Sequence, residues 1–216
     1  MGEWFAKLSE IHWYSWLVVA LLISVFVALS VAGKKTNWNS RRIAYAAMAI
    51  AISFVLSYIR MWRMPQGGSV TLVSMLPIIA FSVAAGPLQG LMVGCAYGML
   101  QLIQDMYVIH PLQMLLDYPL AFGALALGGF ATMLRIPKYW QLPAAIVIGC
   151  FGRYAMSVLS GVVFFAEYAE GSGHTPFVYS AIYNSYIGVE AALCIAVALI
   201  PGVSRIVGIL KQSQTR

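Results

Sequence analysis

LPAAIVIGCFGRYAMSVLSGVVFF, at residues 142–165, is a run of 24 residues with a single charged side chain, Arg153. A bilayer-spanning helix needs about 20 mostly apolar residues, because lipid offers no partner for a free backbone N–H or C=O. The run therefore predicts a membrane-spanning helix. Polar or small residues recur on it every three or four positions, which places them on one face that is turned toward protein: Arg153, Ser157, Ser160 and Gly161. This face serves either a ligand or close helix packing.

The composition extends the membrane prediction to the whole chain. Of the 216 residues, 61% are hydrophobic and only 9% are charged, whereas soluble domains carry roughly 25% charged residues. A water-soluble globule and a disordered chain are both excluded, since each needs more charge. The net charge of +6 suits basic loops at a membrane surface better than a nucleic-acid partner. Three cysteines lie in apolar runs without metal-ligand spacing, so neither a disulfide framework nor a metal site is expected: Cys95, Cys150 and Cys194.

Six further apolar runs predict an all-α, polytopic helical bundle with seven spans in total. They cover residues 13–33, 43–59, 70–85, 88–104, 112–134 and 179–200. Gly86 and Pro87 separate two of them so closely that these two form an antiparallel hairpin. The first run has an alternative interpretation as a signal peptide. Its length and the Lys34-Lys35 pair that follows it favour a retained helix.

Lysine and arginine gather on one side of this predicted bundle. They occupy the loops after the first and fifth spans and the C-terminal tail: Lys34, Lys35, Arg41, Arg42, Arg135, Lys138, Arg205, Lys211 and Arg216. Because cytoplasmic loops carry an excess of Lys and Arg, the N-terminus is expected outside and the C-terminus in the cytoplasm. Arg60 and Arg63 fall on the outer side, against the trend.

Polar and aromatic residues gather at the predicted outer ends of the spans. Asp117 lies in the first turns of an apolar helix, where an ionised carboxylate is costly unless it is paired or meets a ligand. Arg153 is its candidate structural partner. Tyr118, Tyr107, Phe165, Tyr168, Tyr179 and Asn184 lie at the same level, Glu190 lies deeper, and residues 60–69, with Trp62, form either a lid or a plain connecting loop. Aromatic faces with a carboxylate favour a small, planar, cationic heteroaromatic ligand.

Four blocks in this order resemble one known family. MPQGGSVTLVSMLPI (64–78), YVIHPLQMLLDYPLAF (107–122), GVVFFAEYA (161–169) and YSAIYNSY (179–186) are similar to the thiamine-specific substrate-binding (S) subunits, the ThiT family, of bacterial energy-coupling-factor (ECF) transporters. The resemblance covers residues 42–201. It divides the chain into an extra N-terminal transmembrane helix with a basic loop (1–41), a six-helix S-component core (42–201) and a basic tail (202–216).

The resemblance implies an extracellular thiamine pocket in a multi-pass protein of the cell membrane. It places Trp62, Gly67 and Gly68 in a lid over the site. Positions that match the family's binding residues are Tyr107, Asp117, Tyr118, Tyr179 and Asn184. Phe165 stands where some members have a tryptophan, and Ser157 where some have a histidine, so stacking and one hydrogen bond are expected to differ. Tyr168 and Glu190 are candidates from their own positions in the chain.

The same resemblance implies partner subunits. Family members bind a membrane-embedded coupling subunit through small residues at four-residue spacing on the helix that corresponds to 43–59, where Ala47 and Ala51 lie. Two ATPase subunits complete the importer. Because the chain has no Walker A motif, ATP hydrolysis is expected only in those partners, and no cofactor or metal is expected here.

Two other functions are open to a chain of this kind. One is an intramembrane serine protease that uses Ser160, but the histidines His12, His110 and His174 fall in predicted tails or loops. The other is a solitary transporter for another small cationic heteroaromatic vitamin or precursor. Secondary transporters often carry matched broken helices in internal repeats, and the lone Pro77 does not form such a pair.

Overall fold

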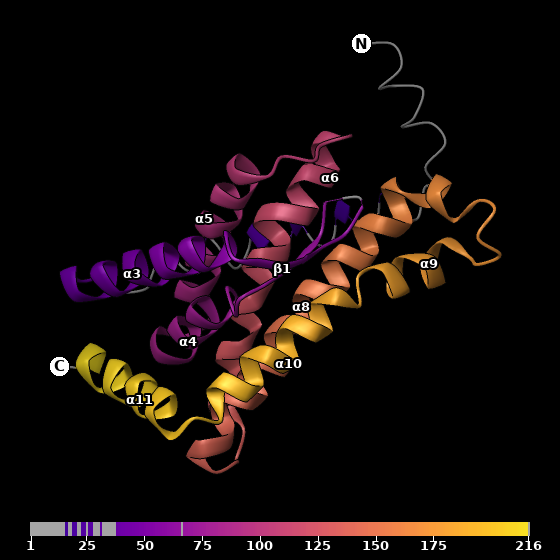
Figure 1. Ribbon diagram of the computed structural model, residues 1–216. Coiled ribbons are helices and arrows are strands. Elements are labelled where there is room, and N and C mark those ends of the chain that lie inside the picture. The colour runs from indigo at the N-terminus through magenta and orange to yellow at the C-terminus, as the bar shows by residue number, and fades with distance from the viewer. Residues whose placement is uncertain are drawn as a thin grey trace.

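A computed structural model describes residues 38–65 and 67–215, together with residues 16, 19, 20, 23, 24, 26, 27 and 31, which are helical. Most of the predicted first span and of the N-terminal segment 1–41 thus lies outside the described residues. In the remainder the predicted helical membrane bundle is confirmed (Figure 1). Four helical stretches are long and apolar enough to cross a membrane: Ser40–Ser57, Pro111–Met133, Lys138–Phe164 and Pro176–Ala198.

The helices follow one another along the chain, with a hairpin between the first two of them (Figure 1). They are α3 (Ser40–Ser57), α4 (Leu76–Ala85), α5 (Pro87–Gln104), α6 (Pro111–Leu115), the π-helix η1 (Leu116–Leu120), α7 (Ala121–Gly123), the 3-10 helix η2 (Ala124–Met133), α8 (Lys138–Phe164), the 3-10 helix η3 (Ala166–Ala169), α9 (Pro176–Tyr183), α10 (Tyr186–Ala198) and α11 (Pro201–Thr215). The expected tight turn at Gly86 and Pro87 joins α4 to α5. Gly86 has a φ of 102°, which a residue with a side chain rarely adopts.

One span was predicted too long. The run 70–85 begins as a strand, and helix α4 starts only at Leu76. With 10 residues and a rise of about 1.5 Å per residue, α4 covers roughly half of the 30 Å hydrocarbon layer. Of the apolar residues before it, Val70 is buried in strand β2, and Leu72, Val73 and Met75 lie in the turn between β2 and α4.

A β-hairpin corrects the purely α-helical prediction. Strand β1 (Arg60–Arg63) pairs antiparallel with β2 (Ser69–Thr71), with Trp62 opposite Val70. The turn closes through a backbone hydrogen bond from Met64 N–H to the Gly68 carbonyl at 2.7 Å. Gly67 has a φ of 100° there, the left-handed region that glycine enters at no steric cost. The predicted loop is therefore a hairpin that crosses the middle of the bundle in Figure 1.

Close packing of α8 against its neighbours forms the core. Figure 1 shows α8 and α10 side by side, and η2 lies along α8. Gly149 permits the approach of η2, because an added Cβ would lie 2.6 Å from the Leu125 carbonyl oxygen. The largest fully buried apolar side chains are Tyr97, Met75, Ile78, Ile79, Leu116, Leu125, Ile146 and Ile187.

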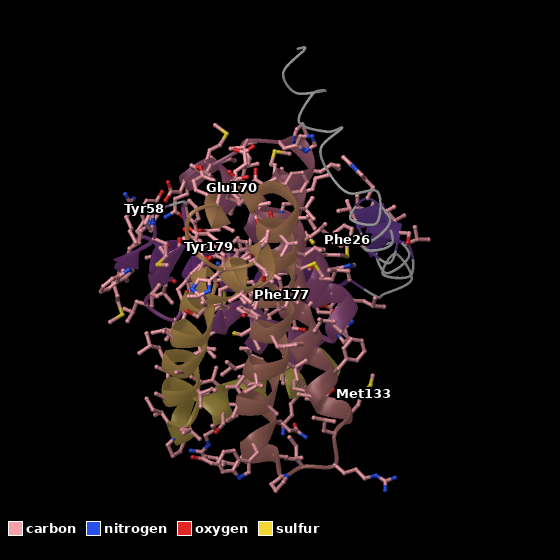
Figure 2. The ribbon with its side chains drawn as sticks, turned by 90° about the vertical axis from the view of Figure 1, so that its right-hand side faces the viewer. Phe26, Tyr58, Met133, Glu170, Phe177 and Tyr179 are labelled. Atoms are coloured by element: carbon pink, nitrogen blue, oxygen red, sulfur yellow. The ribbon has the colours of Figure 1, made fainter. Side chains whose placement is uncertain are left out.

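The loops at the two ends of the bundle differ in character. Tyr58, Glu170 and Tyr179 lie toward one end in Figure 2, and Met133 lies toward the other. The described basic residues that predicted the cytoplasmic side, such as Arg41, Arg135 and Lys138, sit at or beside the helix ends on the Met133 side. The hairpin and the connections after α5 and α8 belong to the opposite end, which the charge pattern predicts to be outside.

Candidate functional site

A cavity opens at the hairpin end of the bundle. It contains about 930 Å³ of empty space, its open mouth included. Its walls come from the hairpin, the α5–α6 connection, η1, α8 and the α9–α10 region. Segments that are distant in the sequence thus meet around one space.

Ten of the twelve predicted site residues line this cavity. They are Gly67, Gly68, Tyr107, Asp117, Tyr118, Ser157, Phe165, Tyr168, Tyr179 and Asn184. Trp62 and Glu190 do not belong to the lining. Trp62 is 67% exposed on the outer strand of the hairpin, and Glu190 is buried beneath it. The structure brings the ten together, and ligand binding by them stays a prediction.

Asp117 and Tyr118 sit on η1, a π-helical turn that contains Pro119. Proline has no N–H to donate, so the regular helix ladder is interrupted here, and π-turns often occur at functional sites. Asp117 Oδ2 accepts a hydrogen bond from Gln113 Nε2 at 2.6 Å. The same amide nitrogen donates to the Tyr107 carbonyl at 3.1 Å. Gln113, four residues before Asp117, therefore orients the carboxylate.

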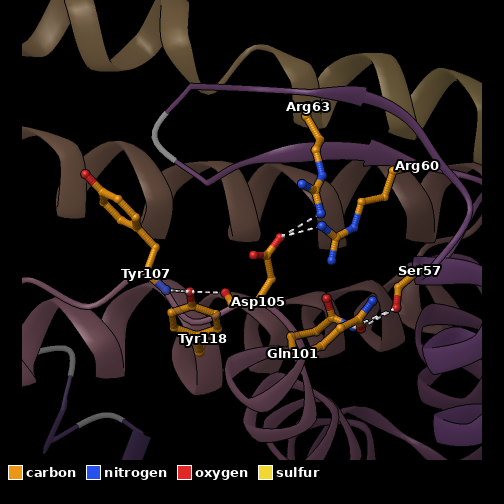
Figure 3. Close-up of polar contacts among 8 residues, drawn as sticks. Ser57, Arg60, Arg63, Gln101, Asp105, Tyr107 and Tyr118 are labelled. Carbon is orange, nitrogen blue, oxygen red and sulfur yellow. Dashed lines mark hydrogen bonds and ion pairs between the residues drawn. The ribbon is translucent and has the colours of Figure 1, made fainter.

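Tyr118 ties the cavity wall to the α5–α6 connection (Figure 3). Its hydroxyl accepts from the Tyr107 N–H at 2.8 Å and donates to the Asp105 carbonyl at 2.8 Å. The phenol is thus satisfied by backbone on both sides, and its ring remains available to the cavity.

The alternative interpretation of Asp117 as the partner of Arg153 in an ion pair is not borne out. Within the described part of the chain, the ion pairs closer than 4.0 Å join Asp105 to Arg60 and to Arg63. The Arg153 guanidinium instead lies 4.2 Å above the ring of Phe122, a favourable cation–π position. Of the two carboxylates that line the cavity, Asp105 is paired with arginines, whereas Asp117 has no Lys or Arg nitrogen within 4.0 Å among the described residues, although Arg153 lines the same cavity. It is therefore the group left to meet a cationic ligand.

Asn184 is fixed between α8 and α9. Its amide nitrogen donates to the Ser157 carbonyl at 3.3 Å and to the Ser180 carbonyl at 3.0 Å. The close approach of α9 to α8 requires a glycine at position 161, since a Cβ there would lie 2.0 Å from Ser180 Oγ. The alternative interpretation of Gly161 as a packing residue is consistent with this contact, although Gly161 also lines the cavity. The amide oxygen of Asn184 is the atom left to accept a hydrogen bond from a ligand.

Three aromatic rings form one edge of the cavity. Tyr107 stacks on Phe165 with ring centroids 6.1 Å apart and planes 21° apart. Tyr168 follows at 5.9 Å from Phe165. The hydroxyls of Tyr107 and Tyr168 share a hydrogen bond of 3.2 Å, which, with partial burial, raises the pKa of Tyr107 to about 12. This edge is therefore neutral at physiological pH and offers aromatic faces to a planar ligand.

The hairpin turn covers the cavity closely. An added Cβ on Gly68 would lie 2.6 Å from the Tyr186 ring, and one on Gly67 would lie 3.2 Å from Tyr107 Cβ. Figure 3 shows Arg60 and Arg63 reaching from strand β1 to Asp105. The Arg60 contact is a hydrogen-bonded ion pair of 2.5 Å. Arg60 and Arg63, the two cations that fall on the predicted outer side, thus both have an ionic partner there in Asp105.

Glu190 holds the base of the hairpin. Its carboxylate accepts hydrogen bonds from Thr71 Oγ1 at 2.6 Å, Ser74 Oγ at 3.0 Å and Thr71 N–H at 3.3 Å. Between these two partners lies Val73, with a φ of 50°, a strained value for a β-branched residue. Because the bonds fix both sides of the turn, they stabilise it. Glu190 is buried, and its hydrogen-bond partners lie in β2 and in the turn after it and not in the cavity lining.

Several lining residues were not among the predicted twelve. Their positions in the walls identify them: Arg60, Ser69, Gln101, Asp105, Gln113, Phe122, Arg153, Gly161, Ser180, Tyr183 and Tyr186. Tyr183 and Tyr186 belong to the same tyrosine-rich run as Tyr179, and Gln113 stands one turn before Asp117. These two signals were visible in the sequence. The contact of Arg60 with Asp105 depends on the hairpin and had no local signal.

A helical membrane bundle with a polar and aromatic cavity at one end defines the class of membrane-embedded solute-binding transport proteins. Within that class, the family model described as Thiamine transporter protein (Thia_YuaJ) matches residues 43–208. The chain belongs to this family.

Individual relatives agree with the family match. The thiamine transporter ThiT of Bacillus subtilis (strain 168) is 36% identical over 146 residues, which cover 63% of this chain and 75% of the relative. ThiT of Lacticaseibacillus paracasei (strain ATCC 334) is 30% identical over 155 residues, covering 64% and 74%. A solved structure of ThiT from Listeria monocytogenes matches with a TM-score of 0.61 at 24% identity, over 81% of this chain and 95% of that one. The last comparison supports the fold.

Proposed function

We propose that this protein binds thiamine in the cavity and serves as the substrate-binding component of an ECF importer. The observation that carries the proposal is that Asp117, which forms no ion pair within the described part of the chain, lies in a cavity lined by aromatic rings. Thiamine has a cationic thiazolium ring and an aminopyrimidine ring. The carboxylate offsets the positive charge, the rings stack, and the Asn184 amide oxygen accepts from the amino group. The named relatives support this choice of ligand.

Entry from outside follows from the charge pattern. The cavity opens at the end opposite to the basic loops, so the ligand enters from the extracellular side, with the C-terminus in the cytoplasm. Inward delivery requires a coupling subunit and two ATPases, which the chain meets through α3. Ala47 and Ala51 lie on exposed positions of that helix, where small residues permit close helix contact. Transport, and not catalysis, is the proposed activity.

Ligand titration tests the substrate. Purified full-length protein is titrated with thiamine while its tryptophan and tyrosine fluorescence is recorded, with an uncharged and an anionic vitamin as comparison ligands. We expect saturable quenching at one thiamine per chain and none with the other two ligands. Saturation by another ligand but not by thiamine would overturn the assignment.

Co-purification separates the coupled importer from a solitary transporter. The tagged protein, expressed in its own cell, should retain an ATPase-bearing complex in detergent. Replacing Ala47 and Ala51 by Leu should release that complex while thiamine binding is kept, because the cavity lies away from α3. Thiamine uptake that persists after loss of the complex would favour the solitary transporter.

The ion pair between the hairpin and Asp105 should slow ligand release. Replacing Arg60 by Gln is expected to raise the thiamine dissociation rate about two- to fivefold, because partly exposed pairs contribute roughly 0.2–1 kcal/mol. Stopped-flow release at low and high salt measures this effect, and the salt dependence should weaken in the variant. Arg63→Gln is the matched control, since its side chain is 69% exposed and 3.8 Å from the carboxylate. Equal rates in the two variants would contradict the role of Arg60.

A further inference from the structure

The described residues before α3 pack against the π-turn that carries Asp117. Val19, 2% exposed, forms a buried cluster with Leu116 and Leu120, and Ile23 and Phe26 border it. Phe26 lies 3.6 Å from the position that a Cβ on Gly123 would occupy, on the side of the bundle where Figure 2 labels it. This segment precedes the part of the chain that matches the family, which starts at residue 43.

Leu116 and Leu120 bracket the two residues that face the cavity. Asp117 and Tyr118 line the cavity, whereas Leu116 is fully buried and Leu120 is 8% exposed on the opposite side of the same turn. Pro119 interrupts the hydrogen-bond ladder within it. The position of this turn therefore depends more on packing against Leu116 and Leu120 than the position of a regular helical turn would.

A second contact of the N-terminal residues lies at the start of α6. The ring of Trp16 meets His110 edge to face, with centroids 6.3 Å apart. His110 accepts a hydrogen bond from the Leu112 N–H through Nδ1 at 3.1 Å and so caps α6. It also stacks on Phe164 of α8 at 5.0 Å. Trp16 and Val19 thus touch both ends of the helical stretch that leads to Asp117.

We infer that Trp16 and Val19 form a buttress, a packing contact from outside the family core that holds Asp117 and Tyr118 in position for the ligand. Val19 and Trp16 are positioning residues, because they act through η1 and His110 and line no part of the cavity. The inference rests on the proposed thiamine binding for its affinity readout. Its structural part, the order of residues 113–121, is measurable without any ligand.

Substitutions in the full-length chain test the buttress. Val19→Ala is expected to lower thiamine affinity roughly three- to tenfold, because it leaves an empty packing space beside Leu116 and Leu120. Val27→Ala and Val31→Ala are matched controls, since these side chains are 52% and 57% exposed, and they should change affinity less than about twofold. In an Asp117→Asn background the effect of Val19→Ala should largely disappear, because coupled residues are not additive.

Hydrogen exchange supplies a readout that does not need thiamine. Val19→Ala should speed exchange in residues 113–121 while exchange in α4 and α10 stays as in the wild type. Val19→Thr, which keeps the side-chain shape, is expected to act in the same direction and replaces Val19→Ala if that variant does not fold. Exchange and affinity equal to those of Val27→Ala would overturn the buttress, as would an affinity loss that is unchanged by Asp117→Asn. Failure of the wild type to bind thiamine would instead overturn the proposed function.

Discussion

Replacing Asp117 by Asn should weaken thiamine binding by about a hundredfold. The amide keeps the size of the side chain and an oxygen that accepts from Gln113, so the main change is the loss of the negative charge. Truncating one partner of a buried charge pair costs roughly 2–5 kcal/mol, and each 1.4 kcal/mol is a factor of ten. Isothermal titration of the two proteins measures the difference.

Ser160→Ala is the control for this effect. Ser160 is fully buried on α8, does not line the cavity and lies close to Asp117. Ser160→Ala therefore removes a neutral neighbour of the carboxylate but no charge, and should change affinity less than about threefold. Equal losses in the two variants would mean that Asp117 does not meet the charge of the ligand.

Gly161→Ala should give the second large effect. The new methyl group would lie 2.0 Å from Ser180 Oγ and 2.8 Å from Ser180 Cβ, so α9 must move away from α8 and take Tyr179 and Asn184 with it. Overpacking of this kind costs roughly 1–3 kcal/mol, which corresponds to a loss of affinity of about tenfold or more. Thiamine titration and the melting temperature of the same samples report the change.

A compensating substitution separates the clash from a general effect. In the double variant Gly161→Ala, Ser180→Gly, the glycine lies on α9 instead of α8, so the new methyl group no longer meets a Ser180 side chain. This variant should recover most of the affinity. Gly188→Ala is the matched control, because nothing lies within 4 Å of a Cβ at that position, and it should bind as the wild type does. Failure of the double variant to recover affinity would contradict the contact between Gly161 and Ser180.

The sequence predicted much of the cavity because its residues lie at the ends of apolar runs, where polar and aromatic groups stand out. Asp117, Tyr179 and Asn184 were predicted as site residues in this way. What it did not predict depends on contacts between distant segments. Glu190 and Thr71 are 119 positions apart, and the depth of Glu190 alone suggested a ligand contact.

The hairpin was missed for a related reason. Residues 70–75 are apolar enough to extend the following helix on hydropathy alone, whereas the turn at Gly67 and the pairing of Arg60 with Asp105 make them a strand and a bend. Trp62 is 67% exposed, as its neighbours Met61 and Arg63 are also exposed, and it does not line the cavity as the lid interpretation suggested. Short strands in a membrane bundle have no local periodicity that distinguishes them from a helix end.

A structure of the protein with thiamine bound tests the central claim most directly. The proposal predicts ligand density inside the cavity beneath Gly68, with the positively charged ring beside the Asp117 carboxylate and the aminopyrimidine within hydrogen-bond distance of Asn184. Density at another place, or a thiamine in the cavity whose cationic ring is turned away from Asp117, would contradict it.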